Sequence, residues 1–261
     1  MPSVSSSGAT IAYDVHGDPG APPLLFINSI GTRRELWDAQ RRALEPSYRV
    51  IQYDARGHGQ SSVPPGDYTI AQLGQDALAI LDAERLAAAQ ICGISLGGLT
   101  ALWLAVHAPE RVRALVLANT GARIGSVESW TARIALVREG GMKAVADLAM
   151  PLWFTDGFRA REAATVRRFR DMVEACPVDG YLGCCAALRD EDLRDALGSV
   201  GCPVLAVAGS HDRATAPELL EFVHERLPRS RLVTLDAAHL SNVEQDAAFN
   251  ASLSAFLAAQ V

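Results

Sequence analysis

The stretch Gly93-Ile94-Ser95-Leu96-Gly97-Gly98 decides the fold of this chain. A short apolar run at 88–92 precedes it and an Ala/Leu-rich run at 99–107 follows it, so the pattern predicts a strand, a sharp turn and a helix. The apex of such a turn is strained and accepts only small residues two positions before and after it, where glycines stand. The apical hydroxyl lies beside the amino end of a helix, which stabilises an oxyanion. We therefore interpret Ser95 as a nucleophile.

Strand and helix patterns alternate along most of the 261 residues, which is typical of a parallel sheet covered on both faces. The sequence thus predicts an α/β protein with a mostly parallel, twisted sheet flanked by helices. The expected strands are 10–14, 23–27, 49–54, 88–92, 111–118, 203–208 and 231–235, and the clearest helices are 69–84, 99–107 and 242–258.

The alternation stops between residues 121 and 188, where helical patterns rich in aromatic residues and arginines replace it. We interpret 121–188 as a helical cap laid over the ends of the strands. The core then comprises 1–120 and 189–261. No internal repeat or low-complexity linker interrupts either part.

A serine hydroxyl needs a base, and the base needs a carboxylate that holds its tautomer. His239 follows an expected strand by a short loop and precedes the last helix, so we choose it over the five other histidines. Asp212 follows the strand that ends at Ala208 and lies between serine and histidine in sequence, as this architecture requires. Asp236 is only three residues from His239 and is expected to shape that turn.

The oxyanion hole is expected to combine two backbone N–H groups. One belongs to Leu96, directly after the nucleophile. The other comes from the loop Asn28-Ser29-Ile30-Gly31, which follows the first buried strand, and there we choose the N–H of Ile30.

Composition excludes several classes of function. The formal net charge of −6 argues against a nucleic-acid partner, and no apolar run approaches the ~18 residues that span a bilayer. The N-terminus has neither a basic start nor an apolar segment, so we expect no membrane association and a cytoplasmic location. The five cysteines form no C-x-x-C pair, which predicts reduced thiols and no metal site. We expect Cys92 to pack inside its strand and expect no cofactor.

These residues resemble the α/β-hydrolase superfamily along essentially the whole chain. The elbow and the loop Arg56-Gly57-His58-Gly59 are shared across it, whereas Asn28-Ser29 and His239-Leu240-Ser241-Asn242 are similar to the 3-oxoadipate enol-lactonases. Asp246 departs from the proline often found there, at the start of a surface helix. The resemblance implies an acyl-enzyme mechanism that opens 3-oxoadipate enol-lactone to 3-oxoadipate, a step of the β-ketoadipate pathway of aromatic catabolism.

That substrate is a small anionic lactone, and a bidentate arginine is the natural partner of its carboxylate. Trp130 and Arg133 stand three positions apart in the expected cap, so on a helix they share a face. Our hypothesis is that Arg133 binds the carboxylate and Trp130 walls the ring. The alternative, a solvated arginine beside a core tryptophan, stays open.

Other functions on the same scaffold remain open, because fold and triad do not fix the substrate. They are a general esterase, a perhydrolase or a carbon–carbon bond hydrolase that acts on a small carboxylate-bearing substrate. A non-catalytic ligand receptor is a further alternative. An NAD-dependent enzyme is disfavoured, since Ser95 occupies a glycine position of the dinucleotide-binding motif.

Overall fold

The structure is a computed structural model that describes residues 2–260. Its centre is an eight-stranded sheet in the order β1-β2-β4-β3-β5-β6-β7-β8. The pairs β1/β2 and β2/β4 are antiparallel, and all other neighbours are parallel. The strands are β1 (Ser3–Ser6), β2 (Ala9–His16), β3 (Pro23–Ile27), β4 (Arg49–Tyr53), β5 (Ala89–Ile94), β6 (Val112–Ala118), β7 (Val204–Gly209) and β8 (Ser230–Leu235).

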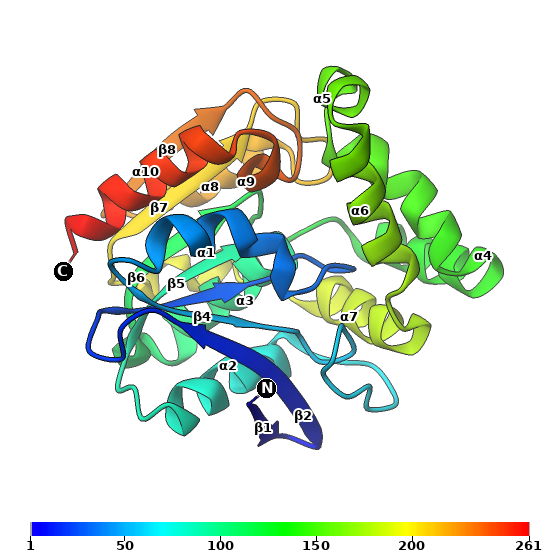
Figure 1. The fold of residues 1–261 in the computed structure, drawn as a ribbon. Helices are drawn as coiled ribbons and strands as arrows, with labels where there is room; N and C mark the ends of the chain where they lie inside the picture. The colour runs from blue at the N-terminus through cyan, green and yellow to red at the C-terminus, as the bar shows by residue number, and fades with distance from the viewer. Residues whose placement is uncertain (1, 261) are drawn as a thin grey trace.

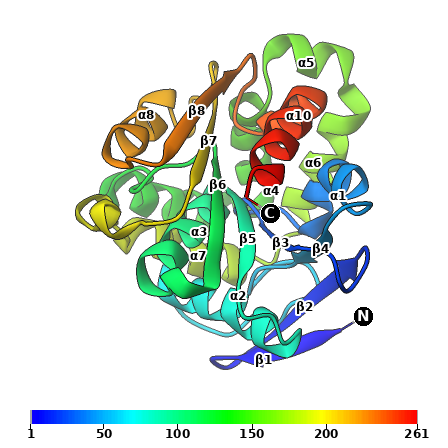
Figure 2. The same cartoon turned by 90° about the vertical axis from the view of Figure 1, so that its left-hand side faces the viewer.

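Helices cover both faces of this sheet, as expected for a parallel sheet of apolar strands. In Figure 2, α1 and α10 lie on one face, and α2, α3 and α8 lie on the other. The α-helices are α1 (Asp38–Leu44), α2 (Ile70–Ala83), α3 (Leu96–His107), α4 (Val127–Trp153), α5 (Asp156–Arg161), α6 (Ala163–Glu174), α7 (Val178–Asp190), α8 (Pro217–Arg226), α9 (Ser241–Glu244) and α10 (Asp246–Ala258). Three 3-10 turns are η1 (Arg34–Trp37), η2 (Pro109–Arg111) and η3 (Arg194–Ser199).

The predicted α/β architecture is confirmed, with differences at some element ends. The strand expected at 88–92 continues to Ile94, and its helix begins at Leu96, so a single residue makes the turn. The helix expected at 242–258 is two helices, because Gln245 between them has φ −127° and ψ 49°, which lie outside the helical region. β1 adds an edge strand that the polar N-terminal sequence did not indicate.

The helices α4 to α7 follow β6 and lie together beyond one end of the sheet (Figure 1). They occupy the segment for which the sequence predicts a cap, and α7 continues two residues past 188. Positive φ at Gly141 interrupts α4, the longest helix described. α7 packs tightly against the core: a β carbon on Gly180 would lie 2.0 Å from the carbonyl oxygen of Gly57.

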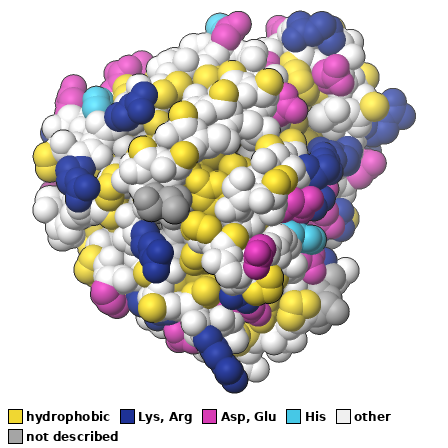
Figure 3. All heavy atoms as spheres, turned by 60° about the vertical axis from the view of Figure 1, so that its left-hand side comes forward, with side chains coloured by type: hydrophobic (Ala, Val, Ile, Leu, Met, Phe, Trp, Pro, Cys, Tyr) yellow, Lys and Arg dark blue, Asp and Glu magenta, His cyan; other side chains and the backbone are white. Residues whose placement is uncertain are grey.

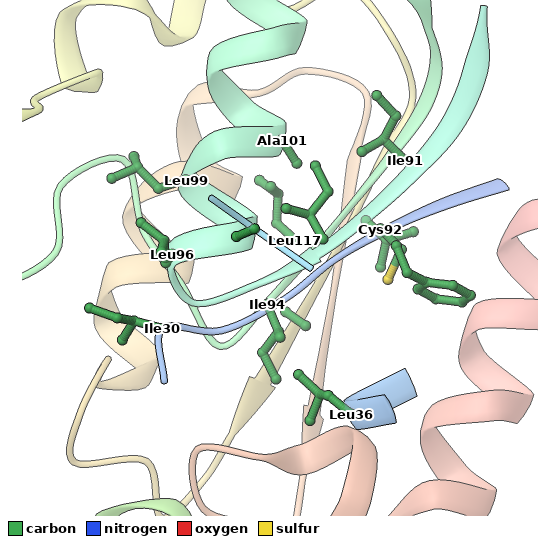
Figure 4. Packing of buried hydrophobic residues seen from close by; sticks show 14 of the residues in the cluster. Ile30, Leu36, Ile91, Cys92, Ile94, Leu96, Leu99, Ala101 and Leu117 are labelled. Carbon is green, nitrogen blue, oxygen red and sulfur yellow. The ribbon is translucent and has the colours of Figure 1, made fainter. Parts of the chain in front are cut away.

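The core near the turn is apolar and closely packed (Figure 4). Ile91, Cys92, Ile94 and Leu117 are all inaccessible to solvent. Burial raises the pKa of the Cys92 thiol well above its ordinary value, so this thiol is unreactive. Cys92 therefore packs inside the strand, as the sequence predicts.

The surface carries charges of both signs. On the face drawn in Figure 3, Lys and Arg side chains are interspersed with Asp and Glu rather than gathered by sign. Among residues 2–260, no helix combines the length and apolar character required to cross a membrane.

Candidate active site

Ser95 lies at the sharp turn between β5 and α3. Its φ of 57° and ψ of −121° place it in a conformation that L-residues seldom adopt. Two hydrogen bonds hold its peptide groups: Ser95 N–H donates to Ala118 O at 3.0 Å, and Thr120 Oγ1 donates to Ser95 O at 2.8 Å. The last residue of β6 and a residue just after that strand thus hold Ser95 in its strained conformation. A strained backbone persists only where such surrounding contacts fix it.

The glycines around Ser95 are required by close backbone contacts. A β carbon on Gly93 would lie 2.1 Å from Gly97 O, and one on Gly97 would lie 2.2 Å from Ile27 O. Neither contact is sterically possible, so no larger residue fits at either place. The strand–turn–helix arrangement around Ser95 is the one that the sequence predicts.

His239 and Asp212 meet on loops that leave the carboxyl ends of β8 and β7. Their side chains are almost wholly buried, and His239 Nδ1 lies 2.9 Å from Asp212 Oδ2. An ionised carboxylate only accepts hydrogen bonds, so the imidazole proton is at Nδ1. Nε2 is then left to accept a proton from a nucleophile. This is the tautomer that a base in a serine hydrolase needs.

The groups around Asp212 keep its carboxyl group ionised. Burial alone would raise its pKa, but the His239 charge and hydrogen bonds from His239, Thr215 and Asn119 outweigh it and lower the pKa to about 2. Oδ1 accepts from the N–H groups of Ala214 and Thr215 at 2.8 and 2.9 Å. Oδ2 accepts from Thr215 Oγ1 at 2.7 Å. The carboxylate therefore stays charged at neutral pH.

Asn119, near Asp212, was not singled out from the sequence, and Ser241 was quoted there only within the motif that carries the resemblance. Asn119 follows β6, and its Nδ2 donates to Asp212 Oδ2 at 2.9 Å, while its Oδ1 accepts from Ser241 Oγ at 2.5 Å. All three side chains are buried. A buried hydrogen-bond chain therefore joins the loops after β6, β7 and β8. The only feature of the sequence that could have indicated Asn119 is that it is a polar residue directly after an expected strand.

Ser95 and His239 line one cavity of about 290 Å³ between the sheet and α4. Hydrogen bonds between nucleophile and base are often long before substrate binds. The shared cavity, rather than a hydrogen bond between these two side chains, is thus the evidence that joins them. A larger surface hollow of about 800 Å³ beside α5 is lined by Asp212 but not by Ser95 or His239, so we assign the chemistry to the smaller cavity.

The cavity wall includes both cap residues singled out from the sequence. Arg133 and Trp130 lie on α4, with the Arg133 guanidinium carbon 6.0 Å from the centre of the Trp130 ring. Arg133 Nη1 donates to the hydroxyl of Tyr181 at 3.1 Å, and Trp130 Nε1 donates to Ile124 O at 2.6 Å. Tyr181, on α7, also lines the cavity and was not predicted. These contacts form one cationic, aromatic wall.

The two predicted oxyanion donors lie at this cavity or beside it. Ile30 lines the cavity, and Leu96 begins α3 directly after Ser95, where the first N–H groups of a helix have no intrahelical acceptor. The hydrogen bond from Thr32 N to Ser29 O at 3.2 Å folds the Ile30 loop into a β-turn. Among residues 2–260, no group of three His, Cys, Asp or Glu side chains is placed to hold a metal ion.

Comparison with known proteins agrees with this fold. A family model described as alpha/beta hydrolase fold matches residues 22–246, and the chain belongs to that family. In sequence it is similar to 3-oxoadipate enol-lactonase 2 of Acinetobacter baylyi, with 41% identity over 97% of this chain and 95% of that protein. Enol-lactonase 1 of the same organism is 37% identical over 96% and 94%.

A solved structure leads to the same group of enzymes. The enol-lactonase of Burkholderia xenovorans superposes with a TM-score of 0.96 and 37% identity, covering 98% of this chain and all of that one. The chain is thus a hydrolase, and these three proteins, to which it is similar across nearly its whole length, are named as enol-lactonases.

Proposed function

We propose that this protein hydrolyses 3-oxoadipate enol-lactone to 3-oxoadipate, with Ser95, His239 and Asp212 as a catalytic triad. One observation supports the proposal above the others. Ser95 in its strained backbone and His239, which is paired with the buried Asp212, line a single small cavity, and an arginine lies in the wall of that cavity. The similarity to named enol-lactonases supports this choice of substrate.

The first half of the reaction forms an acyl-enzyme. Ser95 Oγ attacks the lactone carbonyl carbon while His239 Nε2 takes the hydroxyl proton. The N–H groups of Ile30 and Leu96 stabilise the resulting oxyanion, with about 3 kcal/mol from each donor. Collapse of the tetrahedral intermediate breaks the bond between the ring oxygen and the carbonyl carbon. The departing enol oxygen takes the proton back from His239.

The second half releases the product. The opened chain stays attached to Ser95 as an ester, and its enol converts to the ketone. Water then attacks the ester carbonyl as His239 removes its proton, and the same two N–H groups hold the second oxyanion. Collapse of this intermediate breaks the bond between the carbonyl carbon and Ser95 Oγ, which takes the proton back from His239 and leaves the product as a free carboxylic acid. Because an enolate is a better leaving group than an alkoxide, ring opening needs less assistance than hydrolysis of an ordinary ester.

Substrate selection is assigned to the cavity wall. Arg133 uses Nη1 to hold the Tyr181 hydroxyl, which leaves its other guanidinium N–H groups for a carboxylate. The Tyr181 oxygen accepts from Arg133, so its own proton is free to donate to the same carboxylate. Trp130 bounds the space for the ring. We also propose a cytoplasmic location, since all five cysteines are free thiols.

The proposal is tested by adding purified protein to enzymatically generated enol-lactone and following the loss of its absorbance. We expect turnover by the wild type, none by Ser95→Ala, and full activity in Ser5→Ala, which alters an exposed serine on β1. A panel of neutral aryl esters and a peracid assay run beside it. Rapid turnover of those substrates without turnover of the lactone would contradict the proposal and favour an esterase or perhydrolase.

A further inference from the structure

His58 is a buried histidine that the proposed reaction does not use. It lies in the loop after β4 and is 1% exposed. Its Nε2 accepts a hydrogen bond from the backbone N–H of Gly31 at 2.9 Å, and its Nδ1 lies 3.1 Å from the carbonyl oxygen of Arg56. The ring thus bridges the loop after β4 and the loop after β3, which contains Ile30.

These two contacts fix the tautomer of His58. A backbone N–H can only donate, so Nε2 carries no proton; a carbonyl oxygen can only accept, so Nδ1 carries it. Burial lowers the pKa of His58 to about 4, which keeps the ring neutral at physiological pH. The loop around it is ordered by hydrogen bonds from His58 N to Ala55 O and from Ser61 N to His58 O.

The partner of His58 occupies the centre of the β-turn Ser29–Thr32. Gly31 is the third residue of this turn and has a φ of 75°, whereas Ile30 is not among the residues of positive φ. Positive φ at the third position alone is typical of a type II turn, in which the orientation of the central peptide distinguishes it from type I. The N–H of that peptide is the group that His58 binds.

We propose that His58 is a positioning residue, which holds the Ser29–Thr32 turn in the conformation that aims the Ile30 N–H at the substrate oxyanion. The inference rests on the proposed function, because it takes Ile30 as an oxyanion donor. Without His58 the buried N–H of Gly31 loses its acceptor, and the turn is no longer anchored to the loop after β4, so the turn can shift as a whole. The Ile30 N–H is then misdirected while the carboxylate-binding wall is unchanged.

The test compares His58→Ala and His58→Gln with the wild type. His16→Ala, at the end of β2, serves as a matched control. For His58→Ala we expect kcat on the lactone to fall about tenfold to a hundredfold, with KM within about twofold, because misplacing a donor costs less than deleting it. The rate of reaction with a fluorophosphonate, which forms a tetrahedral adduct, should fall in parallel, and the dissociation constant of 3-oxoadipate should not change. His58→Gln should recover part of kcat, since its amide oxygen can accept from Gly31.

Two results would contradict the role proposed for His58. Unchanged kcat in a folded His58→Ala variant would overturn it, and so would equal losses of kcat and of product affinity, which indicate general loosening. If the wild type does not hydrolyse the lactone, the proposed function fails, while the phosphonylation rates still test His58.

Nitrogen NMR of the wild type gives a second test that needs no variant to fold. The Nδ1–H tautomer, with coupling across the hydrogen bond from Gly31 N to Nε2, is expected. An Nε2–H tautomer would overturn the inference.

Discussion

At the scale of single residues, the cavity wall shows how this protein can select an anion. Arg133 is held by Tyr181 and lies near the face of Trp130, so its guanidinium is oriented before any ligand arrives. An oriented cation loses less conformational entropy on binding a carboxylate than a solvated arginine does. The arrangement therefore supports the proposal that Arg133 binds the carboxylate of an anionic substrate.

Replacing Arg133 should affect charged substrates selectively. We expect Arg133→Ala to raise KM for the enol-lactone roughly tenfold to a hundredfold, the equivalent of losing a charge-assisted hydrogen-bonded pair. KM for a neutral aryl ester should change little. Arg138→Ala, at an exposed position on the same helix, is the control. Equal effects on both substrates would remove Arg133 from substrate recognition.

The places of Ser95, Asp212 and His239 in the fold could be predicted from their positions along the chain. The strand–turn–helix around Ser95 was predictable from its two glycines, and the sequence predicted Asp212 and His239 as acid and base from their order and the strands before them. The structure places these two side chains in contact. Asn119 and Tyr181 could not be found in this way, because their contacts join segments that only the folded chain brings together.

At the scale of elements, α7 is a helix that joins the group α4–α7 closely to the loop after β4. Gly180 approaches Gly57 so closely that neither has room for a side chain, and Tyr68 N–H donates to Gly183 O at 3.1 Å. The next residue after Gly180 is Tyr181. The backbone contact thus sets the position of the cavity wall relative to the loop that contains His58.

A methyl group at the contact between Gly180 and Gly57 should loosen the packing of α7 against the loop after β4 and shift the cavity wall. Gly180→Ala would place its β carbon 2.0 Å from Gly57 O. We expect the free energy of unfolding to fall by about 3 kcal/mol, as for other overpacked sites, and KM for the lactone to rise as Tyr181 shifts. Gly198→Ala, with open space around its β carbon, is the control in urea unfolding. Equal stability of the two variants would contradict this account of the contact.

The elements themselves were predictable to different degrees. β3 and β5 are apolar runs buried along their whole length, so their sequences are unambiguous. β1 is short and mostly polar, with two of its four residues exposed, and it exists because β2 offers it a partner. The break at Gln245 was hidden because residues on both sides of it favour helix.

At the scale of the whole molecule, buried titratable groups link stability to pH. The pKa of His58 is about 4 in the folded protein, against about 6.5 for an exposed histidine. Between these values the unfolded chain binds a proton that the folded protein does not, so the free energy of unfolding falls as pH falls through this range. The low pKa of Asp212 acts in the same direction at lower pH, between about 4 and 2.

The contribution of His58 can be isolated with His58→Gln, which has no group that titrates there. From about pH 7 to about pH 4.5, the wild type should lose about 2.5 kcal/mol more of its free energy of unfolding than the variant loses. Urea unfolding at both pH values measures this difference, and effects of the other carboxylates cancel in the comparison. Parallel losses in the two proteins would show that His58 is not held neutral by burial.

The most direct test of the whole account is the site and the base-dependence of covalent labelling. After incubation with a fluorophosphonate, mass spectrometry of the digested protein should find one adduct, on Ser95. The labelling rate should fall at least a hundredfold in His239→Ala, because general-base assistance contributes about that much or more. An adduct on another residue, or labelling of Ser95 at an undiminished rate without His239, would contradict the proposal that these two side chains act together.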